Sequence, residues 1–161
     1  MNPHAYAQKK DGWCGPAAMQ YALSQQGKEV SQEVLARRSN TTTEGLDQKP
    51  LEHLAKQYGA ETVVSQGKDP AATLLLLQAY RNMGWSVILD YMAGDEVKED
   101  GHYIVLEKVN RDSLTVFDPS NGGSIKDISK EYFINHWKDV DEDGKTLKNY
   151  ALMMILSEPY E

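Results

Sequence analysis

The first half of the chain carries apolar residues at helical spacing, separated by polar residues and closed by glycines. This pattern predicts four helices, over about residues 14–26, 31–38, 50–58 and 69–82. Ser31 and Asp69 are typical N-caps, because their side chains accept hydrogen bonds from the first N–H groups of a helix. Pro50 fits the first position of a helix, and Gly27 and Gly84 are typical of residues that end one. The first half is therefore expected to be mainly helical.

The second half is rich in β-branched and aromatic residues, as strands are. Strands are predicted over residues 85–92, 103–109, 114–118 and 151–156, with a further short strand over 61–64. Residues 110–112 predict a tight turn between two antiparallel strands, and a helix from Ser129 to about Lys138 interrupts the sheet. This order predicts an α+β fold, with an N-terminal helical half packed on a C-terminal antiparallel sheet half. A cleft between such halves is a natural place for a site.

Composition and charge narrow the classes of function. The chain has 161 residues, so one domain over residues 1–161 is expected. A net charge of −7, with no long run of lysine and arginine, argues against nucleic-acid binding. The longest apolar runs, 74–77 and 151–156, fall far short of the ~20 residues of a membrane-spanning helix. The N-terminus lacks the apolar stretch of a secretory signal, so a cytoplasmic location is expected.

Cys14 is the only cysteine in the sequence. An internal disulfide and a cysteine-rich zinc site are therefore excluded, which leaves a buried apolar residue, an incidental thiol or a nucleophile. Gly15 allows the backbone to come close to a ligand, and Pro16 favours a helix start. Cys14 thus falls at a predicted helix N-terminus, where free N–H groups and the helix dipole favour an anion. The nucleophile and the buried structural residue both stay open at this point.

A cysteine nucleophile needs a base that later protonates the leaving group. His4 lies near the N-terminus, and His53 and His136 fall within helical patterns. In contrast, His102 opens a predicted strand, and Asp118 closes the next one. If paired residue numbers in these strands add to 220 or 222, both side chains lie on one face and the carboxylate can orient the imidazole. A sum of 221 places them on opposite faces, and a turn-forming aspartate is then the alternative.

Gln8 lies six residues before Cys14, on the approach to the predicted helix. Its side-chain amide, together with the Cys14 backbone N–H, can donate hydrogen bonds to a tetrahedral oxyanion. A lone glutamine is usually a surface residue, so only this spacing singles it out.

Together these residues resemble the double-glycine leader peptidase family. Its members are papain-like cysteine peptidases that process bacteriocin and peptide-pheromone precursors, often as the N-terminal domain of an ABC exporter. The resemblance runs from about Gln8 to Leu156 and rests most on Gln8, Cys14-Gly15-Pro16-Ala17-Ala18, Gly101-His102-Tyr103-Ile104-Val105 and Asp118-Pro119. Softer matches are residues 31–38, 41–46 and 51–59, with Phe133 and Trp137.

The resemblance implies a papain-like cysteine peptidase fold with a core of about residues 8–156. It implies Cys14 as nucleophile, His102 as general base and acid, Asp118 as the residue that orients His102, and Gln8 in the oxyanion hole. The implied activity is hydrolysis of a peptide bond in a leader of the double-glycine type, through an acyl-enzyme. No cofactor or metal is expected. The implied partners are a peptide or protein substrate and an ABC exporter, at the cytoplasmic face of a membrane.

The sequence also departs from the family pattern. Trp13 stands where many relatives carry aspartate, residues 94–101 form a charged loop before His102, and an acidic insertion spans residues 139–145. These differences leave the substrate open. Acyl transfer to an amine or thiol, and deconjugation, would use the same four residues. A non-catalytic module that docks a leader peptide is a further alternative.

Residues 139–144 begin like a calcium-binding loop, with acidic residues at positions 1, 3 and 5 and glycine at position 6. Position 12 is Tyr150, where a calcium loop has a bidentate glutamate. An exposed acidic turn is therefore the expectation.

Overall fold

The computed structural model describes residues 2–93, 100–141 and 143–157. Residues 94–99, most of the charged loop predicted before His102, lie outside the described residues. The helices are η1 (Pro3–Tyr6), α1 (Cys14–Gln25), α2 (Gln32–Ser39), α3 (Gln48–Gln57), α4 (Pro70–Asn82) and α5 (Lys130–His136). Within the described ranges, no helix has both the length and the apolar content to cross a membrane.

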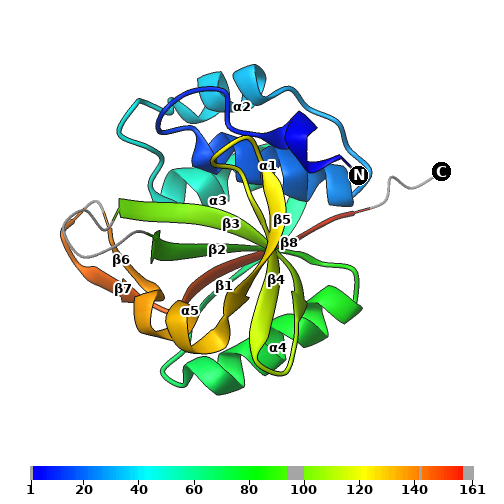
Figure 1. The fold of residues 1–161 in the computed structure, drawn as a ribbon. Coiled ribbons are helices and arrows are strands. Elements are labelled where there is room, and N and C mark those ends of the chain that lie inside the picture. Colours follow the sequence, from blue (N-terminus) through cyan, green and yellow to red (C-terminus); the bar gives the residue numbers. More distant parts are fainter. Residues whose placement is uncertain (1, 94–99, 142, 158–161) are drawn as a thin grey trace.

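The described strands form one large antiparallel sheet and one small one (Figure 1). The order in the large sheet is β1 (Ala60–Gln66), β8 (Tyr150–Leu156), β2 (Ser86–Ala93), β3 (Asp100–Val109), β4 (Ser113–Asp118) and β5 (Ser124–Ser129). The small sheet pairs β6 (Lys138–Val140) with β7 (Thr146–Lys148). The predicted α+β fold is confirmed, because the N-terminal helices pack on a sheet built mainly from the second half.

Helices cover both faces of the large sheet (Figure 1). Helices α1, α2 and α3 lie on one face, and α4 and α5 lie on the other. The helical first half is therefore split, because α4 follows α3 along the chain but packs on β2 and β3 from the opposite side. Strand β1 also comes from the first half and pairs with β8, near the end of the chain.

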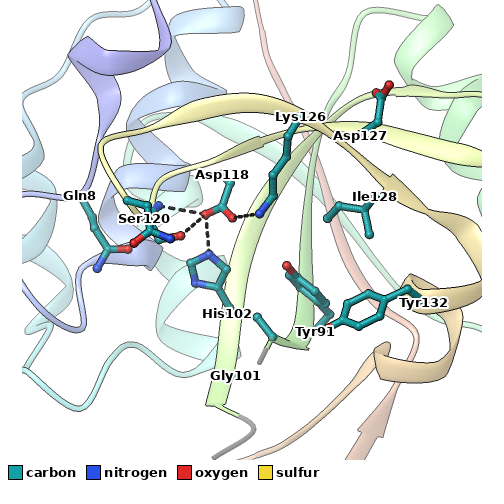
Figure 2. A pocket seen from close by; sticks show the side chains of 12 residues that line it. Gln8, Tyr91, Gly101, His102, Asp118, Ser120, Lys126, Asp127, Ile128 and Tyr132 are labelled. Atoms are coloured by element: carbon teal, nitrogen blue, oxygen red, sulfur yellow. Dashed lines mark hydrogen bonds and ion pairs between the residues drawn. The ribbon is translucent and has the colours of Figure 1, made fainter. Parts of the chain in front are cut away.

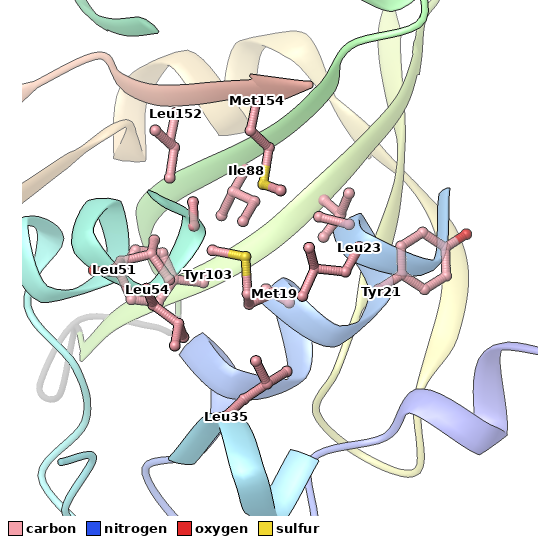
Figure 3. Packing of buried hydrophobic residues seen from close by; sticks show 14 of the residues in the cluster. Met19, Tyr21, Leu23, Leu35, Leu51, Leu54, Ile88, Tyr103, Leu152 and Met154 are labelled. Carbon is pink, nitrogen blue, oxygen red and sulfur yellow. The ribbon is translucent and has the colours of Figure 1, made fainter. Parts of the chain in front are cut away.

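Each face of the sheet has its own apolar core. Figure 3 shows the core under α1–α3, which includes Met19, Leu23, Leu35, Leu51, Leu54, Ile88, Leu152 and Met154. The core under α4 and α5 includes Leu74, Leu77, Leu89, Phe133 and Trp137. Successive residues of a strand point to opposite faces, so Ile88 enters the first core and Leu89 the second. Burial on both faces explains why β2 is mainly apolar in the sequence, without an alternation of apolar and polar residues.

The predicted helix caps are confirmed at Ser31 and Asp69, and the predicted position of Pro50 is wrong. Ser31 Oγ accepts a hydrogen bond from the Val34 N–H, and Asp69 Oδ1 accepts one from the Ala72 N–H. Helix α3 begins at Gln48, two residues before Pro50. A proline is tolerated throughout the first turn, because N–H groups there have no partner within the helix. Proline therefore marks the first turn and not its first residue.

A β-bulge interrupts the pairing of β3 with β4. Near the hairpin turn, Lys108 pairs with Thr115, so the paired residue numbers add to 223. Beyond the bulge, Leu106 pairs with Val116, and the sum becomes 222. Glu107 is therefore one extra residue on β3, and every later residue of this strand is shifted by one position relative to β4.

The bulge decides which face His102 occupies. With the sum of 222, His102 and Asp118 lie on the same face of the sheet and are diagonal neighbours. Without the extra residue, the sum of 223 would place their side chains on opposite faces. Of the two sums that the sequence analysis linked to a shared face, 220 and 222, the structure therefore has 222.

Contacts from both helical layers hold Glu107 in place. From α1, the Tyr21 hydroxyl and Gln25 Nε2 donate hydrogen bonds to Glu107 Oε1. From α4, Arg81 Nε donates to the Glu107 carbonyl oxygen at 3.3 Å. The Tyr21 ring also stacks on Phe117 of β4, with ring centroids 4.1 Å apart. The register of the β3–β4 hairpin is thus anchored on both sides of the sheet.

Candidate active site

Cys14 is the first residue of α1, and it is buried, with 9% of its surface exposed. The segment before it approaches another loop closely: Gly12 has a φ of +80°, and a Cβ there would collide with the carbonyl groups of Thr42 and Thr43. Glycine alone accepts this conformation and this contact without strain. The backbone therefore places Cys14 at the positive end of the helix dipole, as the sequence predicted.

His102 and Asp118 come together from neighbouring strands (Figure 2). His102 lies near the start of β3, and Asp118 is the last residue of β4. His102 Nε2 and Asp118 Oδ1 are 2.7 Å apart, and the side chains are only 13% and 5% exposed. The carboxylate is thus in position to fix the orientation of the imidazole.

The charged forms of His102 and Asp118 stabilise each other. Burial alone would lower the pKa of His102, but hydrogen bonds and charge interactions with Asp118 and Cys14 outweigh burial and raise this pKa to about 9. Burial would raise the pKa of Asp118, but the interactions with His102, Lys126 and Ser120 hold it well below its usual range. At neutral pH the imidazolium and the carboxylate are therefore the favoured forms.

Cys14 lies next to the imidazole. Hydrogen-bond and charge interactions with the Cys14 side chain are among the causes of the raised His102 pKa. Since Nε2 of His102 faces Asp118, Nδ1 is the ring nitrogen left for the sulfur. Of the three predicted residues, His102 and Asp118 are thus in direct contact, and Cys14 acts on the pKa of the same imidazole.

Gln8 makes hydrogen bonds both to the segment that follows Asp118 and to the segment that precedes Cys14. Its backbone N–H donates to the Pro119 carbonyl at 2.8 Å, which places it beside the residue that follows Asp118. Its side-chain Nε2 donates to the Lys10 carbonyl at 3.2 Å, on the segment that leads to Cys14. The oxygen of the same side-chain amide, Oε1, is buried without a hydrogen-bond partner. One N–H of the side-chain amide remains for another acceptor.

An open cavity of about 480 Å³ lies beside the pair (Figure 2). Gln8, His102 and Asp118 line it, together with Tyr91, Ala93, Gly101, Ser120, Asn121, Lys126, Asp127, Ile128 and Tyr132. Neither Cys14 nor any of the other three histidines, His4, His53 and His136, is among the lining residues.

Two further residues that contact Asp118 were not predicted. Ser120 donates to Asp118 Oδ1 from its backbone N–H at 2.9 Å and from its hydroxyl at 2.7 Å. Aspartate commonly binds the backbone two residues on, so this contact could have been read from the sequence. Lys126 Nζ lies 2.6 Å from Asp118 Oδ2. Nothing in the sequence pattern points to Lys126, because its contact depends on the pairing of β4 with β5.

An acidic pair of a buried Asp90 and a half-buried Asp139, also not predicted, supports the start of β3. Asp90 Oδ2 accepts a hydrogen bond from Gln48 Nε2 at 2.7 Å. Burial and the neighbouring Asp139 raise the pKa of Asp90 well above its usual range, which favours a proton on the pair. The Asp139 carboxylate packs against Gly101, where a Cβ would collide with it. A lone aspartate in the apolar run of β2 was the available signal for this cluster.

No metal site is found in the described part of the chain, where no group of three or more histidine, cysteine, aspartate or glutamate side chains is arranged to hold an ion. In the calcium-like segment, Asp141 Oδ1 accepts hydrogen bonds from the N–H groups of Asp143 and Lys145. This carboxylate oxygen thus closes the acidic turn. Glu142 of the same segment lies outside the described residues.

Several solved structures share this fold. The peptidase domain of Streptococcus ComA, described as a bi-functional ABC transporter involved in a quorum-sensing pathway, aligns with a TM-score of 0.74 and 22% identity over 94% of this chain and 96% of that one. A double glycine motif protease from an AMS/PCAT transporter, in complex with the leader peptide, aligns with a TM-score of 0.66 and 16% identity over 94% and 89%.

A third structure is the N-terminal peptidase C39 like domain of the toxin secretion ATP-binding protein from Vibrio parahaemolyticus. It aligns with a TM-score of 0.58 and 15% identity over 93% of this chain and all of that one. No curated protein sequence matches the chain significantly. The model of the Peptidase C39 family, however, matches residues 4–141, well over half of the sequence. The chain therefore belongs to the peptidase C39 family and is a cysteine peptidase.

Proposed function

We propose that Cys14 is the nucleophile of this peptidase, that His102 is its general base and acid, and that Asp118 orients His102. The observation that best supports these roles is the contact of His102 Nε2 with Asp118 Oδ1 at 2.7 Å, together with the contribution of Cys14 to the raised pKa of the same ring. The base is then hydrogen-bonded to the group that orients it, and the nucleophile acts on the pKa of that base.

The reaction follows from these positions. The Cys14 sulfur, its proton held by His102, attacks the carbonyl carbon of the scissile bond, and the carbonyl oxygen becomes an oxyanion. The backbone N–H of Cys14 and the remaining N–H of the Gln8 amide donate hydrogen bonds to this oxyanion. As the C–N bond breaks, His102 passes its proton to the leaving amine, and an acyl-enzyme remains on Cys14. Water, deprotonated by His102, then releases the acid and restores the thiol.

We further propose that the substrate is a peptide with a double-glycine leader. Support comes from family membership together with the likeness to a double glycine motif protease solved in complex with its leader peptide. The same likeness supports an ABC exporter as partner, because the ComA and AMS/PCAT structures are both described as parts of ABC transporters. Such a partnership would place the reaction at the cytoplasmic face of a membrane.

The test uses a synthetic peptide whose leader ends in Gly-Gly, followed by a short cargo. We expect the wild type to cut after the second glycine, as read by mass spectrometry, and expect Cys14→Ala to leave the peptide intact. A matched peptide with Ala-Ala in place of Gly-Gly separates the leader type from general peptidase activity. Labelling with iodoacetamide or E-64 at neutral pH reports on Cys14 independently of the substrate.

The outcomes are distinct. Labelling of Cys14 no faster than that of free cysteine would contradict its role as an activated nucleophile. Rapid labelling with cleavage of neither peptide would contradict the substrate but not the nucleophile. Adding an amine such as glycine amide decides between hydrolysis and acyl transfer, because transfer gives a product heavier than the acid by the mass of the amine less one water.

A further inference from the structure

Lys126 approaches Asp118 from the strand on its far side (Figure 2). In the β4–β5 pairing, Lys126 is opposite Val116, so it shares a face with Asp118 as a diagonal neighbour. Lys126 Nζ lies 2.6 Å from Asp118 Oδ2, with the lysine side chain 43% exposed and the aspartate side chain 5% exposed. The ammonium thus reaches from the solvent side of the cavity to a buried carboxylate.

The hydrogen bonds of Asp118 are divided between its two oxygens. Oδ1 accepts from His102 Nε2 and from the backbone and hydroxyl of Ser120. Oδ2 has the contact with Lys126. Lys126 therefore holds the second oxygen of a carboxylate whose first oxygen faces the imidazole. Removing it would leave that oxygen buried without its charged partner, and the carboxylate plane would be free to turn.

The same contact places two cations on one carboxylate. The imidazolium of His102 and the ammonium of Lys126 both draw on the negative charge of Asp118. Because like charges disfavour each other, Lys126 limits how far Asp118 stabilises the imidazolium. A histidine that held its proton too firmly would be a poorer acid toward the leaving amine.

We propose that Lys126 is a positioning residue of this site, which fixes the orientation of Asp118 and moderates the charge that Asp118 presents to His102. This inference rests on the proposed roles of Cys14, His102 and Asp118.

The other groups around His102 and Asp118 do not place a second positive charge on the Asp118 carboxylate. Tyr91 of β2 faces Asp118, but burial raises the pKa of its hydroxyl, so the ring stays uncharged. Asp127 of β5 and Tyr132 of α5 line the same cavity. Asp127 Oδ1 accepts a hydrogen bond from Thr115 Oγ1 at 2.6 Å, and Asp127 alternates with Lys126 along the strand. Cys14 of α1 also raises the pKa of the imidazole.

The test compares Lys126→Met, which keeps the length of the side chain but not its charge, with Lys126→Arg, which keeps the charge. Lys148→Met is the matched control, because Lys148 is an exposed strand lysine in the small sheet, outside the cavity lining. The pKa of His102 is measured by NMR titration of its ring, and kcat and KM are measured between pH 5 and 10. Circular dichroism and thermal unfolding show whether each variant is folded.

For Lys126→Met we expect the His102 pKa to rise by about 0.5 to 1, a shift reduced by the exposure of the lysine. We also expect kcat to fall about 3- to 30-fold with KM little changed, since general acid–base catalysis contributes about 10²–10⁴ in total. Lys126→Arg should restore most of both quantities, and Lys148→Met should match the wild type.

An unchanged His102 pKa in folded Lys126→Met would overturn the inference, whatever the activity. So would a fall in kcat that Lys126→Arg does not relieve, because a charge held at Oδ2 would then not be the cause. The NMR titration needs no substrate. A failed peptide assay would therefore count against the proposed function, while the titration alone still decides the role of Lys126.

Discussion

Replacing Asp118 by asparagine is the most direct test of the His102–Asp118 contact. An asparagine keeps the shape but has one accepting oxygen and one donating NH₂ group. In the protein, Oδ1 faces His102 and Ser120, and Oδ2 faces the Lys126 ammonium. If the amide oxygen faces His102, the NH₂ group meets the ammonium. If the oxygen faces Lys126, the NH₂ group meets the imidazole. Asparagine therefore cannot satisfy both neighbours.

The size of the effect follows from the histidine pKa. A rise from 6.5 to about 9 corresponds to roughly 3 kcal/mol in favour of the imidazolium. Asp118 and Cys14 share this stabilisation. If Asp118 supplies half or more, its loss weakens the charged pair by about 1.5–3 kcal/mol, or about 10- to 100-fold. Misorientation of the ring adds to this, so we expect kcat/KM to fall between about 10-fold and 10³-fold.

The assay is kcat/KM for the double-glycine peptide between pH 5 and 10. In the wild type, the imidazolium is lost as the pH rises through about 9, so activity should decline on the alkaline side there. In Asp118→Asn the imidazolium is less stable, so the decline should begin at lower pH.

An unaltered kcat/KM across the whole range would refute this reasoning and remove Asp118 from the site. The mechanism would then reduce to Cys14 and His102. Thermal unfolding of the variant, compared with the wild type at pH 7, shows whether a loss of activity reflects loss of structure.

Two other predictions follow from the same neighbourhood. Gln8→Ala should lower kcat by about 10²-fold, as the loss of one oxyanion donor does. Gln8→Glu is similar in size but lacks the N–H donors, so it should lower kcat as much. Steady-state kinetics should show this fall with a near-normal KM, and full activity in Gln8→Glu would contradict the prediction. Gly101→Ala should destabilise the protein by about 1–3 kcal/mol and reduce cleavage, because the new Cβ meets the Asp139 carboxylate beside His102. Urea unfolding measures the loss of stability. A wild-type midpoint with wild-type activity would show that Asp139 simply moves aside.

Local signals in the sequence were enough to predict most elements. Helix α4 begins after Asp69 and ends before Gly84, and α5 begins after Ser129, whose hydroxyl accepts a hydrogen bond from the Tyr132 N–H. Strand β5 was not predicted, because Ile125 and Ile128 are its only large apolar residues and most of the strand is exposed. β5 belongs to the sheet because it pairs with β4, and a local sequence pattern does not reveal such a pairing.

The residues of the candidate site also fall into those that a local sequence signal predicts and those that depend on distant contacts. Cys14 and His102 could be chosen from their positions at the start of a helix and of a strand. Asp118 depended on a strand register that the sequence left open, because nothing in the turn shows the extra residue Glu107. Lys126 and the Asp90–Asp139 pair depend on contacts between strands and helices distant in sequence, so no spacing along the chain reveals them.

The bulge at Glu107 also bears on how this hairpin can change in length. Insertions or deletions between residues 109 and 113 fall on the turn side of the bulge, and the anchors on Tyr21 and Arg81 hold the strand beyond it in phase. Between Glu107 and His102, by contrast, the gain or loss of a single residue turns the imidazole to the opposite face of the sheet. The hairpin tip is thus open to variation in length, whereas the number of residues between the bulge and the histidine, four here, cannot change by one.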